Sequence, residues 1–292
     1  MGDCGCGHLH VHARKRDSDR HDPTKTTTLR RRFQAEAYRR FRKLKGRIRK
    51  VIEEEDGFGL KTNRFEFRRD DEKIGAFMEW LRQAQREEIL DVREGIPSSR
   101  AGAQAWSAVY IESAYQRGIA QAAAEMRGQG AQVSERWVDA AFNREIHADR
   151  LGIAYTRTFE ELRGITEAMD QQISRELARG LAEGRNPRAI ASAINNRVDK
   201  VGLTRARTLA RTEVINAHAE ATLNAYEEAG VEGVDALAEF STAGDDDVCE
   251  ECAALEGNVR PLADARGLIP VHPNCRCAWL PVVDDPEALE LV

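Results

Sequence analysis

The segment from Cys249 to Cys277 constrains the fold more than any other part of the chain. It holds four of the six cysteines and one of the seven histidines. A Cys-x-x-Cys pair comes first, and His-Pro-Asn-Cys-Arg-Cys follows it. Two ligand pairs from two short turns are what a closed tetrahedral zinc site needs. The sequence therefore predicts a structural Zn²⁺ site in which four of five residues bind the metal: Cys249, Cys252, His272, Cys275 and Cys277.

Other uses of these cysteines must be weighed against a structural metal. They could form disulfides or be small buried side chains, but the polar N-terminus has no secretory signal and a 32.7 kDa chain has room for a core without covalent links. A catalytic zinc keeps one position open and needs a nearby base, for which Asp245–Asp247, Glu250 and Glu251 are available. Enough ligands to close the site, and no His-Glu-x-x-His motif, favour the structural role.

The N-terminal fifty residues are strongly basic. They contain 16 Lys/Arg and 5 Asp/Glu, although the whole chain has a net charge of −5. Apolar residues recur every three or four positions from Phe33 to Ile52, which predicts an amphipathic helix with a basic outer face. That face could contact DNA phosphates without sequence specificity, could dock on an acidic protein, or could simply be solvated. The candidate nucleic-acid or partner-binding residues are Arg30, Arg31, Arg32, Arg39, Arg40, Arg42, Lys43, Lys45, Arg47, Arg49 and Lys50.

Residues 1–28 precede this helix and are poor in large apolar side chains. Cys4, Cys6, His8, His10 and His12 alternate with other residues, so they predict a flexible tail that binds metal weakly or a strand with one polar face. The start lacks the Ser or Thr expected for myristoylation, and no segment has the apolar length of a membrane span. We therefore expect no membrane contact.

The middle of the chain has the apolar spacing of helices. Gly95–Ser99 predicts a break with Ser98 or Ser99 as N-cap, and an Ala-rich helix then ends at Gly128–Gly130. Ser134 is predicted to cap a helix that continues almost to Glu183. Its second half carries an apolar stripe typical of a packed core: Leu162, Ile165, Met169, Ile173, Leu177 and Leu181.

The last third predicts helices followed by short strands. Asn186 and Pro187 begin a helix through Val198, a break falls at Gly202, and another helix starts near Thr204. Its several glutamates make it a poor reader of a DNA groove, and His218 within it is expected to be a packing or surface residue. Three short strands are predicted within 234–242, 258–262 and 277–283.

Several motifs in a fixed order carry a family resemblance. They are Arg211-Thr-Glu-Val214, Ala217-His-Ala-Glu220, Ala229-Gly-Val231, Thr242-Ala-Gly-Asp-Asp246, Val248-Cys-Glu-Glu-Cys252, Leu255-Glu-Gly257 and Val271-His-Pro-Asn-Cys-Arg-Cys277. This order resembles the phage head morphogenesis (Mu F-like) minor capsid proteins of tailed bacteriophages, over about residues 186 to 283. One departure is Phe240, where the family pattern leads us to expect tryptophan.

The resemblance implies a few-copy virion protein that joins the head during assembly in the host bacterial cytoplasm. Its implied partners are the portal protein and the major capsid protein at the portal vertex or inner capsid surface, with non-specific DNA contact and no small-molecule substrate. It implies no enzymatic activity and no catalytic residues. The alternatives are a zinc-dependent nuclease acting in DNA packaging or ejection, and a host-interacting protein delivered with the genome.

The predicted fold is mainly α, with an extended helical N-terminal region followed by a small zinc-stabilised α+β module at the C-terminus. The predicted domains are a basic tail and amphipathic helix at 1–56, a helical region at 57–185, and the Mu F-like module at 186–292. Because a closed zinc site contributes on the order of 10 kcal/mol to folding, we expect loss of Cys252 to unfold this module and spare the distal helices.

Overall fold

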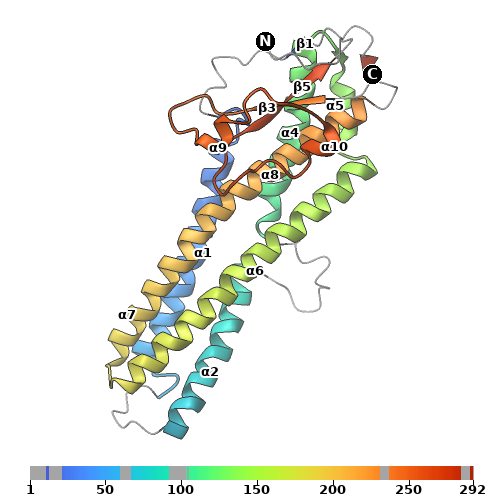
Figure 1. Ribbon diagram of the computed structural model, residues 1–292. Coiled ribbons are helices and arrows are strands. Elements are labelled where there is room, and N and C mark those ends of the chain that lie inside the picture. The colour runs from blue at the N-terminus through green and yellow to red at the C-terminus, as the bar shows by residue number, and fades with distance from the viewer. Residues whose placement is uncertain are drawn as a thin grey trace. The chain divides into compact units, whose positions relative to one another are not determined.

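The fold is mainly helical, as the apolar spacing predicts. The structure is a computed structural model that describes residues 11–12, 22–59, 67–91, 103, 105–230, 237–283 and 290–291. The predicted break at 95–99, and with it the Ser98 or Ser99 cap, lies outside the described residues, as do Cys4–His10. The longer helices are α1 (Thr27–Arg49), α2 (Phe67–Gln85), α4 (Ala108–Gly128), α5 (Glu135–Ala141), α6 (Glu145–Ala182), α7 (Pro187–Arg197) and α8 (Thr204–Ala229) (Figure 1).

Shorter elements complete the described chain. Three π-helical segments continue α1, α2 and α7, and two four-residue helices lie between strands near the C-terminus. They are η2 (Lys50–Glu54), η3 (Arg86–Leu90), η4 (Val198–Leu203), α9 (Glu250–Ala253) and α10 (Leu262–Ala265). The strands are β1 (Val11–His12), β2 (Gln132–Val133), β3 (Leu237–Ser241), β4 (Val259–Pro261), β5 (Ala278–Val283) and β6 (Glu290–Leu291).

The chain divides into two compact units, each built from separate stretches of sequence. Unit 1 comprises Met1–Arg31, Ala108–Tyr155 and Ala210–Val292, whereas unit 2 comprises Arg32–Ser107 and Thr156–Leu209. Of the module predicted at 186–292, residues 210–292 share unit 1 with residues from the N-terminal and middle parts of the chain, whereas residues 186–209 belong to unit 2.

The core of unit 2 is formed by the apolar stripes that the sequence predicts. The α1 stripe is fully buried from Phe33 to Ile48 and continues to Ile52 in η2. The α6 stripe is buried from Leu162 to Leu177, and Phe77 and Leu81 of α2 are equally inaccessible. Trp106 closes one part of this core, because its ring meets Phe33 edge-on at 5.4 Å and its Nε1–H donates to the carbonyl of Ile89 at 2.7 Å. These buried faces supply most of the apolar area that stabilises the unit.

Two helix boundaries differ from the sequence prediction. The predicted break at Gly202 is absent, because η4 joins α7 to α8 without a turn. A Cβ on Gly202 would lie 2.5 Å from the Phe41 ring and 2.9 Å from the Met169 sulfur, so this glycine permits close packing rather than ending a helix. The single helix predicted after Ser134 is instead α5 and α6, because the Asn143 side chain donates to the Asp139 carbonyl and tight turns follow Ala140 and Ala141.

Other helix termini agree with the sequence. The Ser134 hydroxyl accepts from the Trp137 N–H at the start of α5, and the Asn186 side chain accepts from the Ala189 N–H at the start of α7 with proline next in the chain. The α4 helix ends at Gly128, as predicted. The Ser134 and Asn186 side chains each satisfy a backbone N–H in the first turn of a helix, and Gly128 marks the end of α4.

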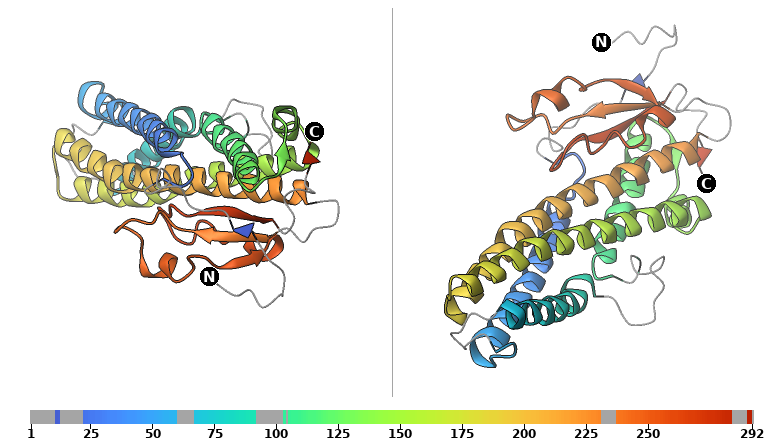
Figure 2. Two further views of the ribbon diagram at one scale, coloured as in Figure 1. Left: turned by 90° about the horizontal axis from the view of Figure 1, so that it is seen from above. Right: turned by 60° about the horizontal axis from the view of Figure 1, so that its bottom comes forward.

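Unit 1 contains a four-stranded sheet packed on helices. Its strand order is β1-β5-β3-β4, and all three pairings are antiparallel. The predicted strands near 237–241, 259–261 and 278–283 are therefore confirmed. Residue Phe240 lies opposite Trp279 in the register, and their rings contact edge-on at 5.5 Å. In both views of Figure 2 the sheet lies against the C-terminal part of α8, where the Tyr226 hydroxyl donates to the Trp279 carbonyl.

Helices α4 and α8 approach each other closely beneath the sheet. A Cβ on Gly118 would lie 2.5 Å from the His218 carbonyl oxygen and 2.7 Å from the Ala221 Cβ. The Thr222 hydroxyl lies 2.9 Å from the carbonyl of His218, within its own helix. Only glycine at position 118 permits this separation of the two backbones.

A buried polar network joins α4, α6 and α8 in unit 1. His147 is 1% exposed, and its two ring nitrogens lie 3.0 Å from the Tyr115 hydroxyl and 3.0 Å from a Glu228 carboxylate oxygen. The Asn224 amide donates to the same hydroxyl at 2.6 Å and accepts from Arg266 at 2.8 Å. Buried polar groups satisfied in this way fix the register of the helices that carry them.

Candidate metal centre

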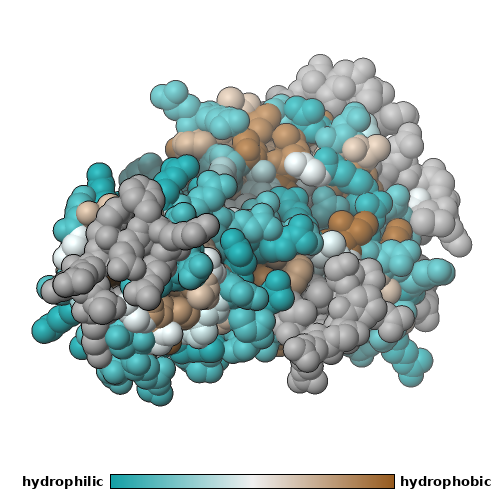
Figure 3. Space-filling model, turned by 90° about the horizontal axis from the view of Figure 1, so that it is seen from below, coloured by the Kyte–Doolittle hydropathy of each residue, from teal (hydrophilic) through white to brown (hydrophobic). Residues whose placement is uncertain are grey.

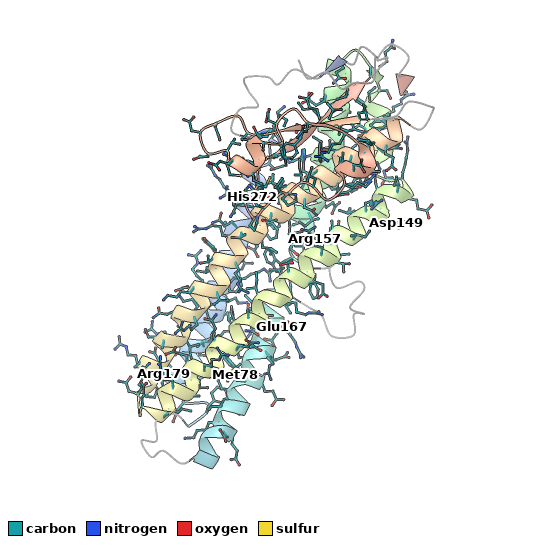
Figure 4. All side chains as sticks on the ribbon, in the orientation of Figure 1. Met78, Asp149, Arg157, Glu167, Arg179 and His272 are labelled. Atoms are coloured by element: carbon teal, nitrogen blue, oxygen red, sulfur yellow. The ribbon has the colours of Figure 1, made fainter. Side chains whose placement is uncertain are left out.

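The predicted ligands converge at one end of the sheet in unit 1. Cys249 immediately precedes the short helix α9 and Cys252 lies within it; Cys249 acts as the N-cap because its sulfur accepts from the Cys252 N–H at 3.4 Å. Cys275 and Cys277 lie immediately before β5. His272 comes from the loop between α10 and β5 and is labelled in Figure 4. Two turns and one loop thus bring together residues that the sequence separates.

The loop with His272 is held in place by backbone contacts. The Cys275 N–H donates to the His272 carbonyl at 3.1 Å, and Asn274 adopts a left-handed φ of 69°. The Asn274 N–H donates to the Thr212 hydroxyl of α8 at 3.2 Å. These bonds hold the histidine and the second pair of cysteines on the same short loop, beside α8.

The geometry around His272 fits a tetrahedral metal. Its Nδ1 lies 2.9 Å from the Pro273 carbonyl, which fixes a proton on Nδ1 and leaves the Nε2 lone pair available. Nε2 lies 3.2 Å from the sulfurs of both Cys249 and Cys252. Tetrahedral zinc bonds imply a nitrogen–sulfur separation of about 3.6 Å, so a small outward shift accommodates the ion.

Two overlapping groups of donors share Cys252. One is Cys249, Cys252 and His272, and the other is Cys252, Cys275 and Cys277, with the donor atoms of each group within 4.8 Å of one another. Four of these five residues line a small hollow of about 30 Å³. The four C-terminal cysteines are free thiols, so the disulfide alternative finds no support among the described residues. This cluster can hold a metal ion through sulfur and imidazole donors.

The thiols differ in their affinity for protons. Burial raises the pKa of Cys252 to about 12, whereas a hydrogen bond from Cys277 lowers the pKa of Cys275 to about 5. The Cys252 backbone N–H lowers the pKa of Cys249, and the Pro273 carbonyl raises the pKa of His272. The thiolate is the form that binds a metal, so a divalent cation bound here would displace the proton that burial keeps on Cys252.

The acidic turn beside the cluster has a structural task. Both oxygens of Asp245 accept from the Arg276 guanidinium at 2.6 Å, and the Asp245 side chain is only 7% exposed. One oxygen also accepts from the Asp247 N–H at 3.2 Å. Asp245 therefore ties the turn before Cys249 to the segment between Cys275 and Cys277, while Asp246 is exposed.

The basic residues of α1 are mostly paired with carboxylates. Arg30 is 6% exposed and pairs with Asp22. Within unit 2, the counter-ions come largely from outside the helix: Glu88 for Lys43 and Arg47, Glu87 for Arg47, Asp91 for Arg40 and Asp199 for Lys45. Arg39 and Arg40 pair with Glu36, Arg49 with Glu53 and Lys50 with Glu55. Arg31, Arg32 and Arg42 are exposed and have no recorded ion pair with a described residue.

The structure also bears on the expected packing role of His218 and on the expected absence of a membrane span. His218 is 2% exposed and bonds through Nε2 to the Gln121 side chain at 3.2 Å, so it is a packing residue. Among the described helices, none combines the length and apolar character of a membrane span.

Two features were not anticipated from the sequence: the His147 network and a basic hollow near the end of α6. Arg175 and Arg179, four residues apart, were a readable signal for the hollow.

Comparison with known families agrees with the motif order. The model of the family described as Phage Mu protein F like protein matches residues 171–280. This match confirms the predicted resemblance for that part of the chain, and it includes all five Cys/His residues of the cluster. Neither a curated protein nor a solved structure matches the chain.

Proposed function

Because residues 171–280 match the Phage Mu protein F like family, we propose that this chain is a minor capsid protein that acts in head morphogenesis of a tailed phage. The family match is the observation that carries the proposal. The proposed role of the chain is assembly, so no reaction is assigned to it.

The Cys/His cluster is proposed to hold one structural Zn²⁺. Cys249, Cys252 and His272 supply three ligands, and Cys275 or Cys277 supplies the fourth. Bound there, the ion would link α9, the loop before β5 and β5 itself through bonds that the small sheet cannot replace. The fifth residue remains beside the site as a buried thiol.

A structural metal is favoured over the nuclease alternative by the donor set. Four thiol sulfurs and one imidazole nitrogen are enough to fill a tetrahedral site without a water ligand. Asp245, one of the nearby acids, is committed to Arg276. Cleavage of plasmid DNA that depends on metal, and that disappears in Asp246→Ala without loss of zinc, would contradict the assembly role.

The proposed place of the protein is the portal vertex or the inner capsid surface, with the portal and major capsid proteins as partners. Co-expression with the portal and coat proteins of the same phage, followed by mass spectrometry of purified procapsids, tests this. We expect a few copies per particle, lost when the portal is omitted. Absence from complete particles would contradict the proposal.

The same assay links the metal to assembly. Cys252→Ser should abolish incorporation, because the surface presented by the sheet is lost with the metal. Glu251→Ser is the matched control, since Glu251 is the exposed neighbour in α9. Equal incorporation of the two variants would separate the metal from the assembly role.

A further inference from the structure

Unit 2 contains a polar hollow that the proposed function does not use. It is a half-open hollow of about 470 Å³, lined by Gln172, Arg175, Glu176 and Arg179 of α6 and by Arg197 of α7. This volume falls within the range of roughly 300–1,000 Å³ that is typical of ligand sites. Figure 4 labels Arg179 near the end of α6, beside α7. Three of the five lining residues are arginines.

A tight helical hairpin builds the walls of the hollow. The α6 helix ends at Ala182, and Gly184 follows it with a φ of 62°, while the Arg185 N–H donates to the Gly180 carbonyl and the Gly184 N–H to the Leu181 carbonyl. Asn186 then caps α7 directly. A Cβ on Gly180 would lie 2.7 Å from the Ile190 side chain, so the two helices approach closely here.

Glu176 organises the arginines and is itself neutralised. Its side chain is 9% exposed, one oxygen accepts from Arg185 at 3.3 Å, and the other accepts from Arg197 at 3.2 and 3.0 Å. The Arg197 hydrogen bonds are the largest cause of the lowered pKa of Glu176, so this carboxylate stays charged. It holds the Arg197 fork in a fixed orientation at the edge of the hollow.

The net charge of the residues around the hollow is positive once its ion pairs are counted. Arg179 pairs only at 3.4 Å with the exposed Glu183, and Arg175 is exposed with no recorded ion pair to a described residue. Four arginines, counting Arg185, therefore face two carboxylates, which leaves two uncompensated positive charges around the hollow. The basic surface of α1 differs, because most of its cations are already paired.

We propose that this hollow binds phosphate oxyanions, with Arg175, Arg179 and Arg197 as the binding residues and Gln172 as a neutral hydrogen-bonding group. Arginine forks match the oxygens of a phosphate group, and two surplus charges suit a ligand with at least two phosphate groups. The ligand is either a free polyphosphate or the phosphodiester backbone of a nucleic acid. The site lies in unit 2 and is independent of the metal cluster in unit 1.

Figure 3 shows that one face of the molecule is largely hydrophilic, with apolar areas separated from one another. Arg175 and Arg179 are both exposed, and neutral substitutions at exposed residues are expected to leave folding intact. The test therefore removes the two exposed arginines together, Arg175→Gln with Arg179→Gln, and keeps Arg197, whose loss would strand Glu176. Arg157→Gln with Arg163→Gln is the matched control, because it removes the same number of charges from exposed arginines of the same helix that lie outside the hollow.

Binding of tripolyphosphate to the full chain at low ionic strength is measured by calorimetry. We expect the double variant to bind at least about tenfold more weakly than the control, as loss of charge-assisted hydrogen bonds requires. Single-stranded oligothymidylate is the second probe. If its binding weakens in the double variant, and the salt slope of the logarithm of affinity falls by about 1.4 for two lost phosphate contacts, the source is a nucleic-acid backbone.

Binding of tripolyphosphate without oligothymidylate identifies a free polyphosphate as the source. Equal binding of tripolyphosphate to the double variant and to the control overturns the proposal, as does failure of the wild-type chain to bind both probes. None of these results depends on zinc or on head assembly. A failed phosphate test therefore leaves the proposed head function standing, and a failed particle test leaves this site standing.

Discussion

The close contact between α4 and α8 gives the sharpest test of the unit 1 packing. In Gly118→Ala, the added methyl would lie 2.5 Å from the His218 carbonyl oxygen and 2.7 Å from the Ala221 Cβ, distances that real Cβ atoms essentially never show. Neither atom can move by a rotamer change, so the helices must separate. Overpacking of this kind costs about 3 kcal/mol at its upper end, and better helix propensity returns about 1 kcal/mol. We expect a net loss of about 2 kcal/mol.

Gly152→Ala is the matched control for this prediction. Gly152 lies in the unit 1 part of α6, and a Cβ there meets nothing within 4 Å. The same substitution should therefore stabilise by about 1 kcal/mol. Hydrogen-exchange mass spectrometry of peptides from 108–128, together with urea denaturation, measures the difference within unit 1. If Gly118→Ala is as stable as Gly152→Ala, the close approach of α4 and α8 is refuted.

Three further predictions concern other packing and titration features. Gly202→Ala should destabilise unit 2 by about 2 kcal/mol in urea denaturation, because Phe41 is fully buried and has no room to move, whereas Gly164→Ala should not. Burial lowers the pKa of His218 to about 4, and its buried Nδ1 has no hydrogen-bond partner among the described residues. Between pH 6.5 and pH 4 the unfolded chain therefore binds a proton at His218 that the folded chain does not bind. Stability should fall over this range by up to about 1.4 kcal/mol per pH unit, and His218→Gln should reduce this slope in pH-dependent unfolding. Asn186→Ala should cost about 1 kcal/mol, measured as faster amide exchange in 187–197.

Sequence patterns predicted the features that depend on neighbouring residues. The 3–4 spacing in α1 and α6 located buried faces correctly, and Ser134 and Asn186 were recognised as caps because their hydrogen bonds close within three residues. The Cys/His spacing identified donors that the structure brings together. Short-range spacing determines each of these features, so no knowledge of the tertiary fold was needed.

Features that depend on distant residues could not be predicted in this way. Gly202 was interpreted as a break because the Phe41 ring that packs on it is far away in sequence. The cations of α1 were candidate DNA contacts because their counter-ions, such as Glu88 and Asp199, come from other elements. The pairing of Val11 and His12 with β5 likewise joins the two ends of the chain.

The central claim is that a structural zinc holds the C-terminal module together. Its most direct test is the zinc content of the purified full chain, measured by elemental mass spectrometry alongside hydrogen exchange of residues 237–283. We expect one zinc per chain, kept in Glu251→Ser and lost in Cys252→Ser together with protection of the β3 and β5 amides. A metal-free protein whose sheet amides remain protected would contradict a metal-built module.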